Sequence, residues 1–383
     1  MLEKKYVKYY LLGYLNYYLV SKEFSFSSES ESYKQYKLRT SLALLGIKSK
    51  MIGKICPVNV MLVVEVAISW FVVSLRFLGV MAKSFFVKKR EFESCLFLPG
   101  ISVASFRVVE MLKSIRPMEV NTFKIPFVKS HYRENDVDVL SCISIKDIYQ
   151  SFWGSLVAIF IIAHKYGYRD FLFRSYSSFE FLLTCCFVRN VEKKNKFVYY
   201  NTYERWAFLF SNAETERIFI QHGKLPAYLH IIKVGTPTKA FYISEEQKDI
   251  LEKVLFYKSP QEFAYRPNLT FVGNELLKNN GKKNILLVCC MNTIEQERKI
   301  IKILSSKNVN LYVKPHPRDK NISEYKEMAS KYNYSLMPKT AYPKVDTVIS
   351  YDSTLADEYE KVDIEVIRYD LLDNINELDK LIS

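Results

Sequence analysis

A histidine placed between two prolines and two cations, in Lys314-Pro315-His316-Pro317-Arg318, is the feature of this sequence that most clearly suggests chemistry. The apolar residues before it predict a β-strand, and the prolines end that strand because proline has no N–H to give to a sheet. In an open α/β sheet, ligands bind at the carboxyl ends of the strands. An imidazole and two cations on a rigid strand end offer several hydrogen-bond donors to a phosphate. We therefore predict a phosphate-binding loop here.

A second cluster, of hydroxyl side chains, follows a predicted strand at 347–349 and opens a predicted helix. Ser350, Ser353 and Thr354 belong to the residue types that cap helices, and the N–H groups at a helix start also attract anions. Capping and phosphate binding are compatible here. Glu358, about one turn further on, suits either ribose hydroxyls or an exposed helix face. The two strand ends together predict one site that holds the phosphate of a nucleotide.

Two titratable residues in the first part of the chain also follow predicted strands. His222 precedes Gly223, which allows close backbone approach to a ligand, so His222 is a candidate general base or phosphate contact, or else a structural turn residue. Glu204 is predicted in the first turn of a helix after strand 197–200, where a carboxylate can act as base or nucleophile. The helix dipole alone also favours an acidic residue there. These two residues are the candidates for a catalytic role.

Composition argues against several classes of protein. The chain has 383 residues, 49% of them hydrophobic, which is enough for two cores. Its seven cysteines include the adjacent pairs 185–186 and 289–290, which lack the spacing of zinc sites and suit free thiols in a reducing cytoplasm. Eleven glycines include no Gly-x-Gly-x-x-Gly or Walker-type loop, which weighs against kinases and dehydrogenases. Asp136 and Asp138 are predicted in a loop rather than at a metal, and no metal is expected.

The formal net charge of +14 predicts attraction to phosphates, nucleic acid or an anionic membrane. The start of the sequence lacks the features of a secretory signal peptide, so a cytoplasmic location is expected. Residues 58–81 are nearly all apolar and precede a basic stretch, but Glu65 and Arg76 make a membrane span costly. A buried core helix is the main interpretation. Peripheral contact with the cytoplasmic face of the inner membrane, or a span, is the alternative.

The order of predicted elements indicates the fold class. Strands alternate with helices, which predicts parallel sheets covered by helices, an α/β fold. The polar stretch 278–283 is typical of a linker, so we expect two Rossmann-like domains, residues 1–278 and 279–383, facing each other across a cleft. The predicted strands lie at 95–98, 137–145, 171–173, 197–200, 217–220, 240–243, 285–289, 311–313, 348–349 and 365–367.

Taken in order, the motifs at 221–223, 314–318 and 350–354 resemble those of bacterial GT-B glycosyltransferases that build capsules and lipopolysaccharide. The nearest subgroups are the sialyltransferases, the polysialyltransferases and the Kdo transferases. The resemblance covers about the last half of the chain. It implies metal-independent transfer of a sialic acid or Kdo type sugar, from a donor activated by cytidine monophosphate (CMP), to a growing surface polysaccharide or lipooligosaccharide.

The resemblance also implies roles for individual residues. His316 and Pro317, with Ser353 and Thr354, would hold the CMP phosphate. Glu204 would be the acidic catalytic residue, with Asp170 and Glu180 as the other possibilities.

Two other interpretations remain open. The same motifs resemble the glycerophosphotransferases of teichoic-acid synthesis, for which the donor would be a CDP-polyol and His222 the base. The charge suggests instead a noncatalytic protein that binds a membrane or nucleic acid. Because Lys and Arg are scattered rather than clustered with aromatic residues, no nucleic-acid partner is expected. The expected partners are a nucleotide-sugar donor and a glycan or glycolipid acceptor.

Overall fold

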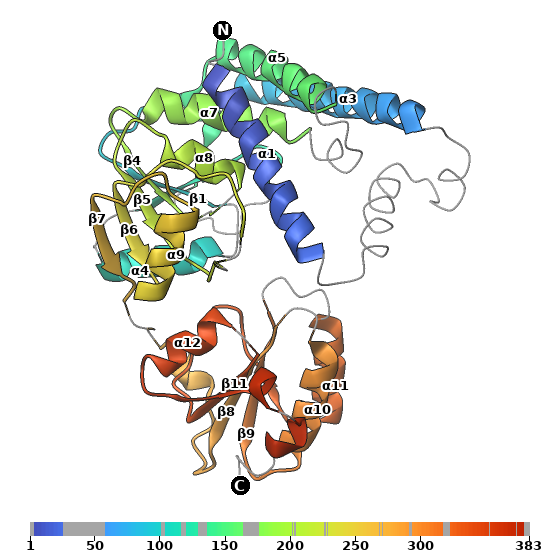
Figure 1. Cartoon of the computed structure of the whole chain (residues 1–383), viewed down its shortest axis with the longest axis vertical. Coiled ribbons are helices and arrows are strands. Elements are labelled where there is room, and N and C mark those ends of the chain that lie inside the picture. Colours follow the sequence, from blue (N-terminus) through green and yellow to red (C-terminus); the bar gives the residue numbers. More distant parts are fainter. Residues whose placement is uncertain are drawn as a thin grey trace. The chain divides into compact units, whose positions relative to one another are not determined.

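The computed structural model of the chain divides into two compact units, Met1–Arg266 and Pro267–Ser383 (Figure 1). Each unit is a parallel β-sheet with helices on both faces, so the predicted α/β class with two Rossmann-like units is confirmed. The predicted cleft between the units stays a prediction. The structure describes residues 4–25, 58–100, 104–115, 120–128, 136–163, 176–200, 202, 204–225, 227, 229–267, 269, 271–290, 293–316, 322–351, 353–372 and 374–378.

The first unit contains a seven-stranded sheet in the order β3-β2-β1-β4-β5-β6-β7, and all its strand pairs are parallel. After β1, the chain adds β2 and β3 on one side and then crosses over to add β4 to β7 on the other. The topological switch point therefore lies between β1 and β4. The strands are β1 Leu96–Pro99, β2 Val120–Lys124, β3 Val137–Asp138, β4 Lys196–Tyr199, β5 Arg217–Ile220, β6 Lys239–Tyr242 and β7 Glu262–Tyr265.

Helices cover both faces of this sheet. On one face, α4 (Ala104–Ile115) packs against the central strands through Val108, Val109 and Leu112. The opposite face carries the main core of the unit. The helices that contribute to it are α1 Lys4–Ser25, α3 Val58–Ser84, α5 Ile145–Ile161, α7 Ser178–Val191, α8 Arg205–Ser211 and α9 Glu245–Val254.

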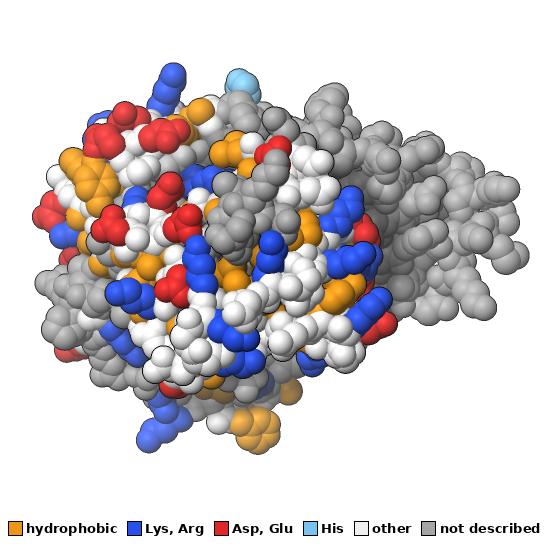
Figure 2. Space-filling model, turned by 90° about the horizontal axis from the view of Figure 1, so that it is seen from below, with side chains coloured by type: hydrophobic (Ala, Val, Ile, Leu, Met, Phe, Trp, Pro, Cys, Tyr) orange, Lys and Arg blue, Asp and Glu red, His pale blue; other side chains and the backbone are white. Residues whose placement is uncertain are grey.

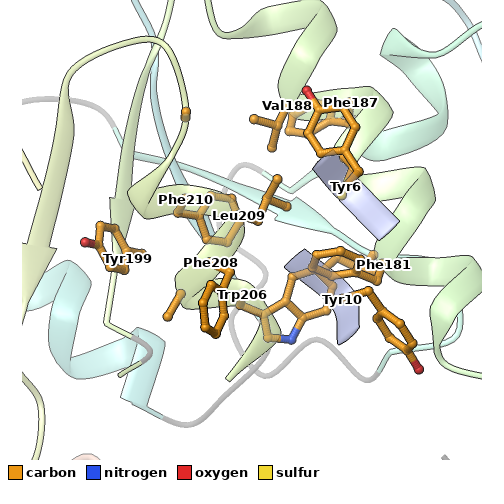
Figure 3. Packing of buried hydrophobic residues seen from close by; sticks show 14 of the residues in the cluster. Tyr6, Tyr10, Phe181, Phe187, Val188, Tyr199, Trp206, Phe208, Leu209 and Phe210 are labelled. Atoms are coloured by element: carbon orange, nitrogen blue, oxygen red, sulfur yellow. The ribbon is translucent and has the colours of Figure 1, made fainter. Parts of the chain in front are cut away.

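Aromatic side chains dominate this main core. The rings of Tyr10 in α1 and Phe181 in α7 lie 5.5 Å apart, and Phe181 lies 5.3 Å from Trp206 of α8 (Figure 3). A Cβ atom on Gly13 would lie 2.2 Å from the Cα of Arg205, so only glycine allows α1 to approach α8 this closely. The N-terminal helix is thereby part of the core of the first unit.

Helices α3 and α5 lie side by side in this unit (Figure 1). Lys89, just after α3, donates to the carbonyl of Leu140, just before α5. The end of α3 therefore lies near the start of α5, and the two helices run antiparallel. Residues Val66–Ser84 of α3 are long and apolar enough to cross a membrane by length and composition, and 17% of that segment is buried. One such helix is weak evidence for a span. The described part of this segment is buried on one side only: Val73 and Val80 lie in the main core, whereas Trp70, Phe71, Leu75 and Leu78 are exposed.

Arg76, the cation in the apolar segment of α3, faces the protein rather than solvent. Its Nη1 donates to Oε2 of Glu180 in α7 at 2.5 Å, and Nη2 of Arg205 lies 3.9 Å from the other carboxylate oxygen. Burial raises the pKa of Glu180 to about 7, although both guanidinium groups act to lower it. This ion pair ties α3 to α7.

The second unit contains a five-stranded parallel sheet in the order β10-β9-β8-β11-β12. Its strands are β8 Asn284–Val288, β9 Asn310–Lys314, β10 Ser335–Leu336, β11 Thr347–Ser350 and β12 Glu365–Arg368. On one face pack α10 (Ile294–Ser305) and α11 (Ile322–Lys331), and on the other packs α12 (Thr354–Glu360). The switch point of this sheet lies between β8 and β11.

The predicted elements match the structure unevenly. Strands β2, β7 and β10 were not predicted. The predicted strand at 137–145 is wrong beyond Asp138, whose carboxylate accepts the N–H of Leu140 and caps a 3₁₀ helix, Val139–Cys142. The predicted strand at 171–173 lies outside the described residues. The units divide at Arg266, earlier in the chain than the predicted boundary after residue 278.

Candidate active site

The carboxyl ends of three neighbouring strands in the second unit form one row. Lys314 at the end of β9 is paired with Val288 of β8, which is paired with Ser350 of β11. Both predicted strand ends are therefore on one edge of one sheet, with β8 between them. Adjacent strands are about 4.8 Å apart, so β9 and β11 are separated by about 10 Å. Because β8 lies between them, a phosphate that contacts the ends of both β9 and β11 must also contact the residues that follow β8.

Lys314 does not have the predicted role of phosphate donor. Its ammonium is buried and donates to the carbonyl oxygens of Pro338, Lys339 and Ala341 at 2.8, 2.9 and 2.8 Å. It also lies 4.5 Å from the centre of the Tyr342 ring. An ammonium group has only three N–H donors, and carbonyls take all three. Lys314 therefore holds the 338–342 loop against the end of β9.

His316 follows β9 after Pro315 and is half-buried. Its imidazole is thus partly accessible at the strand end, where the phosphate loop was predicted. Pro317 and Arg318 lie outside the described residues, and their predicted contacts with a donor stay predictions.

Ser350, the last residue of β11, and Ser353, which follows the strand, have structural roles. The hydroxyl of Ser350 is fully buried and donates to the carbonyl of Val288 at 3.1 Å, which fixes β11 to β8. Ser353 caps α12, since its Oγ accepts the N–H of Ala356 at 3.1 Å, and it lies 2.9 Å from Oγ of Ser350. Because Ser350 is inaccessible, its predicted direct contact with a ligand is wrong, and it acts by positioning Ser353.

Thr354 and Glu358 belong to the short helix that Ser353 caps. Thr354 is its first residue and is half-buried, so it remains a candidate for ligand contact. Glu358 is 8% exposed. The alternative of an exposed helix face is therefore excluded for Glu358, and ribose binding stays a prediction.

Sequence reasoning missed the loop between β8 and α10, which begins at the switch point. Glu297 in α10 is fully buried and accepts the N–H of Cys290 at 2.8 Å and the hydroxyl of Thr293 at 2.6 Å. The hydroxyls of Tyr325 and Tyr369 also donate to it. This carboxylate fixes both ends of the loop. The sequence Thr293-Ile294-Glu295-Gln296 fits the capping-box pattern and marks the helix start, but this pattern does not indicate that Glu297, one residue further on, holds the loop.

In the first unit, His222 lies at the corresponding edge. Its Nδ1 is 2.9 Å from the carbonyl oxygen of Tyr200, and the hydroxyl of Tyr200 donates to the carbonyl of Pro99 at 3.0 Å. These residues follow or end strands β5, β4 and β1, so they bracket the switch point of this sheet. Because a carbonyl only accepts hydrogen bonds, Nδ1 carries the proton and Nε2 of the neutral ring is the basic nitrogen. That arrangement suits a general base.

A buried amide network fixes the backbone around His222. Nε2 of Gln221 donates to Oε1 of Gln247 at 2.7 Å, and Oε1 of Gln221 accepts the N–H of Ile243 at 3.0 Å. Nη1 of Arg266 donates to the Gln221 carbonyl at 3.0 Å. The imidazole is therefore attached to a rigid segment, which is what a base needs to keep its geometry.

Of the acidic candidates, Glu204 comes after β4, the strand adjacent to β5. It is the N-cap residue of α8 rather than a member of the first turn, it is half-buried, and its side chain does not cap the helix. Glu180 is buried and forms an ion pair with Arg76, so its role is to hold α3 against α7. Asp170 lies outside the described residues. Glu204 stays a candidate beside His222.

The aspartates near β3 have structural partners. Asp136 accepts the hydroxyl of Thr122 at 2.6 Å, and Asp138 forms an ion pair with Lys83 at 2.5 Å. Asp138, predicted in a loop, belongs to β3. Within the described part of the chain, no three His, Cys, Asp or Glu side chains gather as a metal site requires.

Comparisons with known proteins leave the family open. No protein-family model and no curated protein matches the chain. The structure of TarM is similar over 52% of this chain and 50% of its own, with 13% identity and a TM-score of 0.31, so the chain spans about half of its length. Acinetobacter baumannii MurG gives 8% identity, coverage of 76% and 90%, and a TM-score of 0.33.

A third similar structure is the apo form of WaaB, a lipopolysaccharide outer core galactosyltransferase. It gives 9% identity, coverage of 67% of this chain and 73% of its own, and a TM-score of 0.33. Similarity at these TM-scores carries no argument about activity. The fold follows from the two sheets themselves.

Proposed function

We propose that the protein is a metal-independent glycosyltransferase that moves a sugar from a CMP-activated donor to a bacterial surface polysaccharide or lipooligosaccharide, with a sialic acid or Kdo type sugar as the first candidate. The main support is the row of strand ends in the second unit. There, His316, Ser353, Thr354 and the loop anchored by Glu297 are attached to adjacent strands of one sheet edge. This is the edge at which open α/β sheets bind nucleotides.

The chemistry requires stabilisation of the leaving nucleotide. When the bond between sugar and phosphate breaks, negative charge accumulates on CMP, and donors that are already in position lower the barrier. His316 and Arg318 are proposed to donate to the phosphate, with the hydroxyls of Ser353 and Thr354 beside them. Lys314 contributes by fixing the end of β9 rather than by contact.

The acceptor hydroxyl must lose a proton as it attacks the sugar carbon. His222 is proposed as the base, because its Nδ1 donates to the Tyr200 carbonyl and its Nε2 can accept a proton. Glu204 is the other proposed base. Neither proposal requires a metal ion.

The test is substitution of His316 with alanine. Removing one donor to a developing negative charge costs about 10²- to 10³-fold in rate. H316A should lose transfer activity to that extent, measured as CMP release from CMP-sialic acid and from CMP-Kdo with a glycan acceptor. The melting temperature should not change, because His316 is half-buried at a loop.

H230A is the matched control, since it removes an exposed imidazole in the first unit, whereas His316 is in the second. Near-normal activity of H316A would remove this residue from the site.

The hydrogen bond at His222 also favours a second candidate function, transfer of a glycerophosphate-type group from a CDP-polyol. In that reaction the acceptor hydroxyl attacks phosphorus, CMP leaves, and the basic imidazole takes the hydroxyl proton. Release of CMP with CDP-glycerol but with neither CMP-sugar would establish this function in place of sugar transfer.

A further inference from the structure

The exposed surface of the α3–α5 pair is unusual for a globular protein. Among the described side chains of α3, the exposed positions include Trp70, Phe71, Leu75 and Leu78. A surface helix normally presents polar residues to water on this side. Contiguous exposed apolar surface marks an interaction site.

Helix α5 continues the same surface. Its exposed residues recur every three or four positions, which places them in a stripe along the whole helix. They are Ile145, Lys146, Tyr149, Trp153, Val157 and Phe160, so all but one are apolar or aromatic. The opposite side of α5 packs into the main core through Ile148, Ala158 and Ile159.

The two stripes lie on the outer side of the helix pair. The ring of Phe77 in α3 lies 4.5 Å from Phe152 and 5.2 Å from Tyr149 in α5, so the two helices are in direct contact there. Val73 and Val80 of α3 are buried in the same core as α5. Since both helices turn one side to a common core and contact each other, their remaining exposed sides point away from it.

Cations flank this surface at one end. Lys83, Lys88 and Arg90 lie at or just after the end of α3, and Lys146 lies in the first turn of α5, where the antiparallel helices meet. All four are exposed, and Lys83 is also paired with Asp138. The described exposed positions of the two helices carry no carboxylate, and just after α3 the exposed Glu91 is outnumbered by the cations beside it. The surface therefore matches an apolar layer with negative charges at its rim.

We propose that the α3–α5 surface docks flat on the interface of a lipid bilayer that contains anionic headgroups. Trp and Tyr are enriched at that interface, and helices with one apolar side and Lys or Arg beside it lie in its plane. Lying flat also agrees with the ion pair of Arg76 and Glu180, which a span of α3 would break. A second copy of this surface would bring the same excess of cations, so it is a poorer match.

The chain carries its own probes for this test. Of its three tryptophans, Trp70 and Trp153 are on the surface, at 42% and 62% exposure, and Trp206 is buried at 4%. Vesicles of phosphatidylcholine with phosphatidylglycerol should sediment the full chain, shift tryptophan emission to the blue, and quench it when the acyl chains are brominated. Vesicles of phosphatidylcholine alone should bind far less.

Variants separate the two contributions. F71S with L78S removes two large apolar contacts and should lower partitioning at least tenfold for each. Changing Lys88, Arg90 and Lys146 to glutamine should lower it roughly a hundredfold at low salt and little at high salt. L371S is the control, since it removes an apolar residue that is 75% exposed in the other unit.

All these substitutions are at exposed positions, so the melting temperature should be retained. Binding to anionic vesicles that F71S/L78S leaves unchanged would overturn the proposal. So would absence of vesicle binding, or a concentration-dependent dimer in solution that F71S/L78S dissociates.

Discussion

At the scale of single residues, the types of side chain at the sheet edges could be predicted from sequence, but their roles could not. His316 is at the end of a strand because an apolar run stops at prolines, which is a local signal. The partners of Lys314 are carbonyls more than twenty residues further along the chain, and no local pattern announces them. Ser350 looked accessible for the same reason, since its burial depends on its position between two other strands.

The role of Lys314 can be tested by K314M, which keeps much of its length and removes its charge and donors. The three carbonyls would lose their donor inside the protein, so the second unit should lose about 3 kcal/mol of unfolding free energy. K302M, at an exposed position of α10, should change it by less than about 0.5 kcal/mol. Denaturant melts give both values. If K314M has normal stability but no longer binds nucleotide, Lys314 contacts the nucleotide directly and the structural role proposed here is wrong.

At the scale of elements, the strands with a run of apolar residues were found from sequence, whereas β2, whose buried Val120 and Phe123 are separated by Asn121 and Thr122, was not. Strand β7 has mostly exposed residues at the edge of its sheet, and β10 has only two residues, so neither gives an apolar pattern. Helix α5 begins at Ile145, where Ser144 and Asp147 form a capping box. Most residues of α5 are apolar or aromatic, so its composition does not reveal that one side of the helix is exposed.

The contact between α3 and α7 predicts a pH dependence. Burial raises the pKa of Glu180 to about 7, from an ordinary value of 4.5. Between these values the folded protein holds the proton more tightly than the unfolded chain, so this group makes the protein less stable as pH rises from about 4.5 to 7. E180Q should remove that part of the slope in urea melts from pH 4 to 8.

E246Q, an exposed position in α9, is the control and should keep the slope. If E180Q has the same slope as the native protein, the carboxyl of Glu180 is not protonated in this range.

At the scale of the whole molecule, net charge alone gives little guidance to function. Lys and Arg are spread over the face seen in Figure 2, with Asp and Glu also present on it. A nucleic-acid surface would instead gather cations with aromatic residues along one groove. At the α3–α5 surface, exposed cations lie beside exposed aromatic and aliphatic side chains, and the apolar character of that surface favours lipid.

Because the chain divides into two units, nucleotide binding can be tested for one unit separately from the other. The second unit has its own sheet, with a core on each face of it. A ligand that binds only the folded state raises the melting temperature of the unit that binds it. The row of strand ends predicts that this unit is the second one.

Thermal melts of the full chain and of residues 267–383, with CMP, CDP, UDP, GDP and ADP in turn, test this claim most directly. Saturating CMP or CDP, at about a hundredfold excess over the dissociation constant, should stabilise the fragment and the full chain by about 2.7 kcal/mol, and the purine nucleotides should have little effect. H316A should abolish the shift in both. A shift in the full chain that is absent from the folded fragment, or no shift with any nucleotide, would contradict the account.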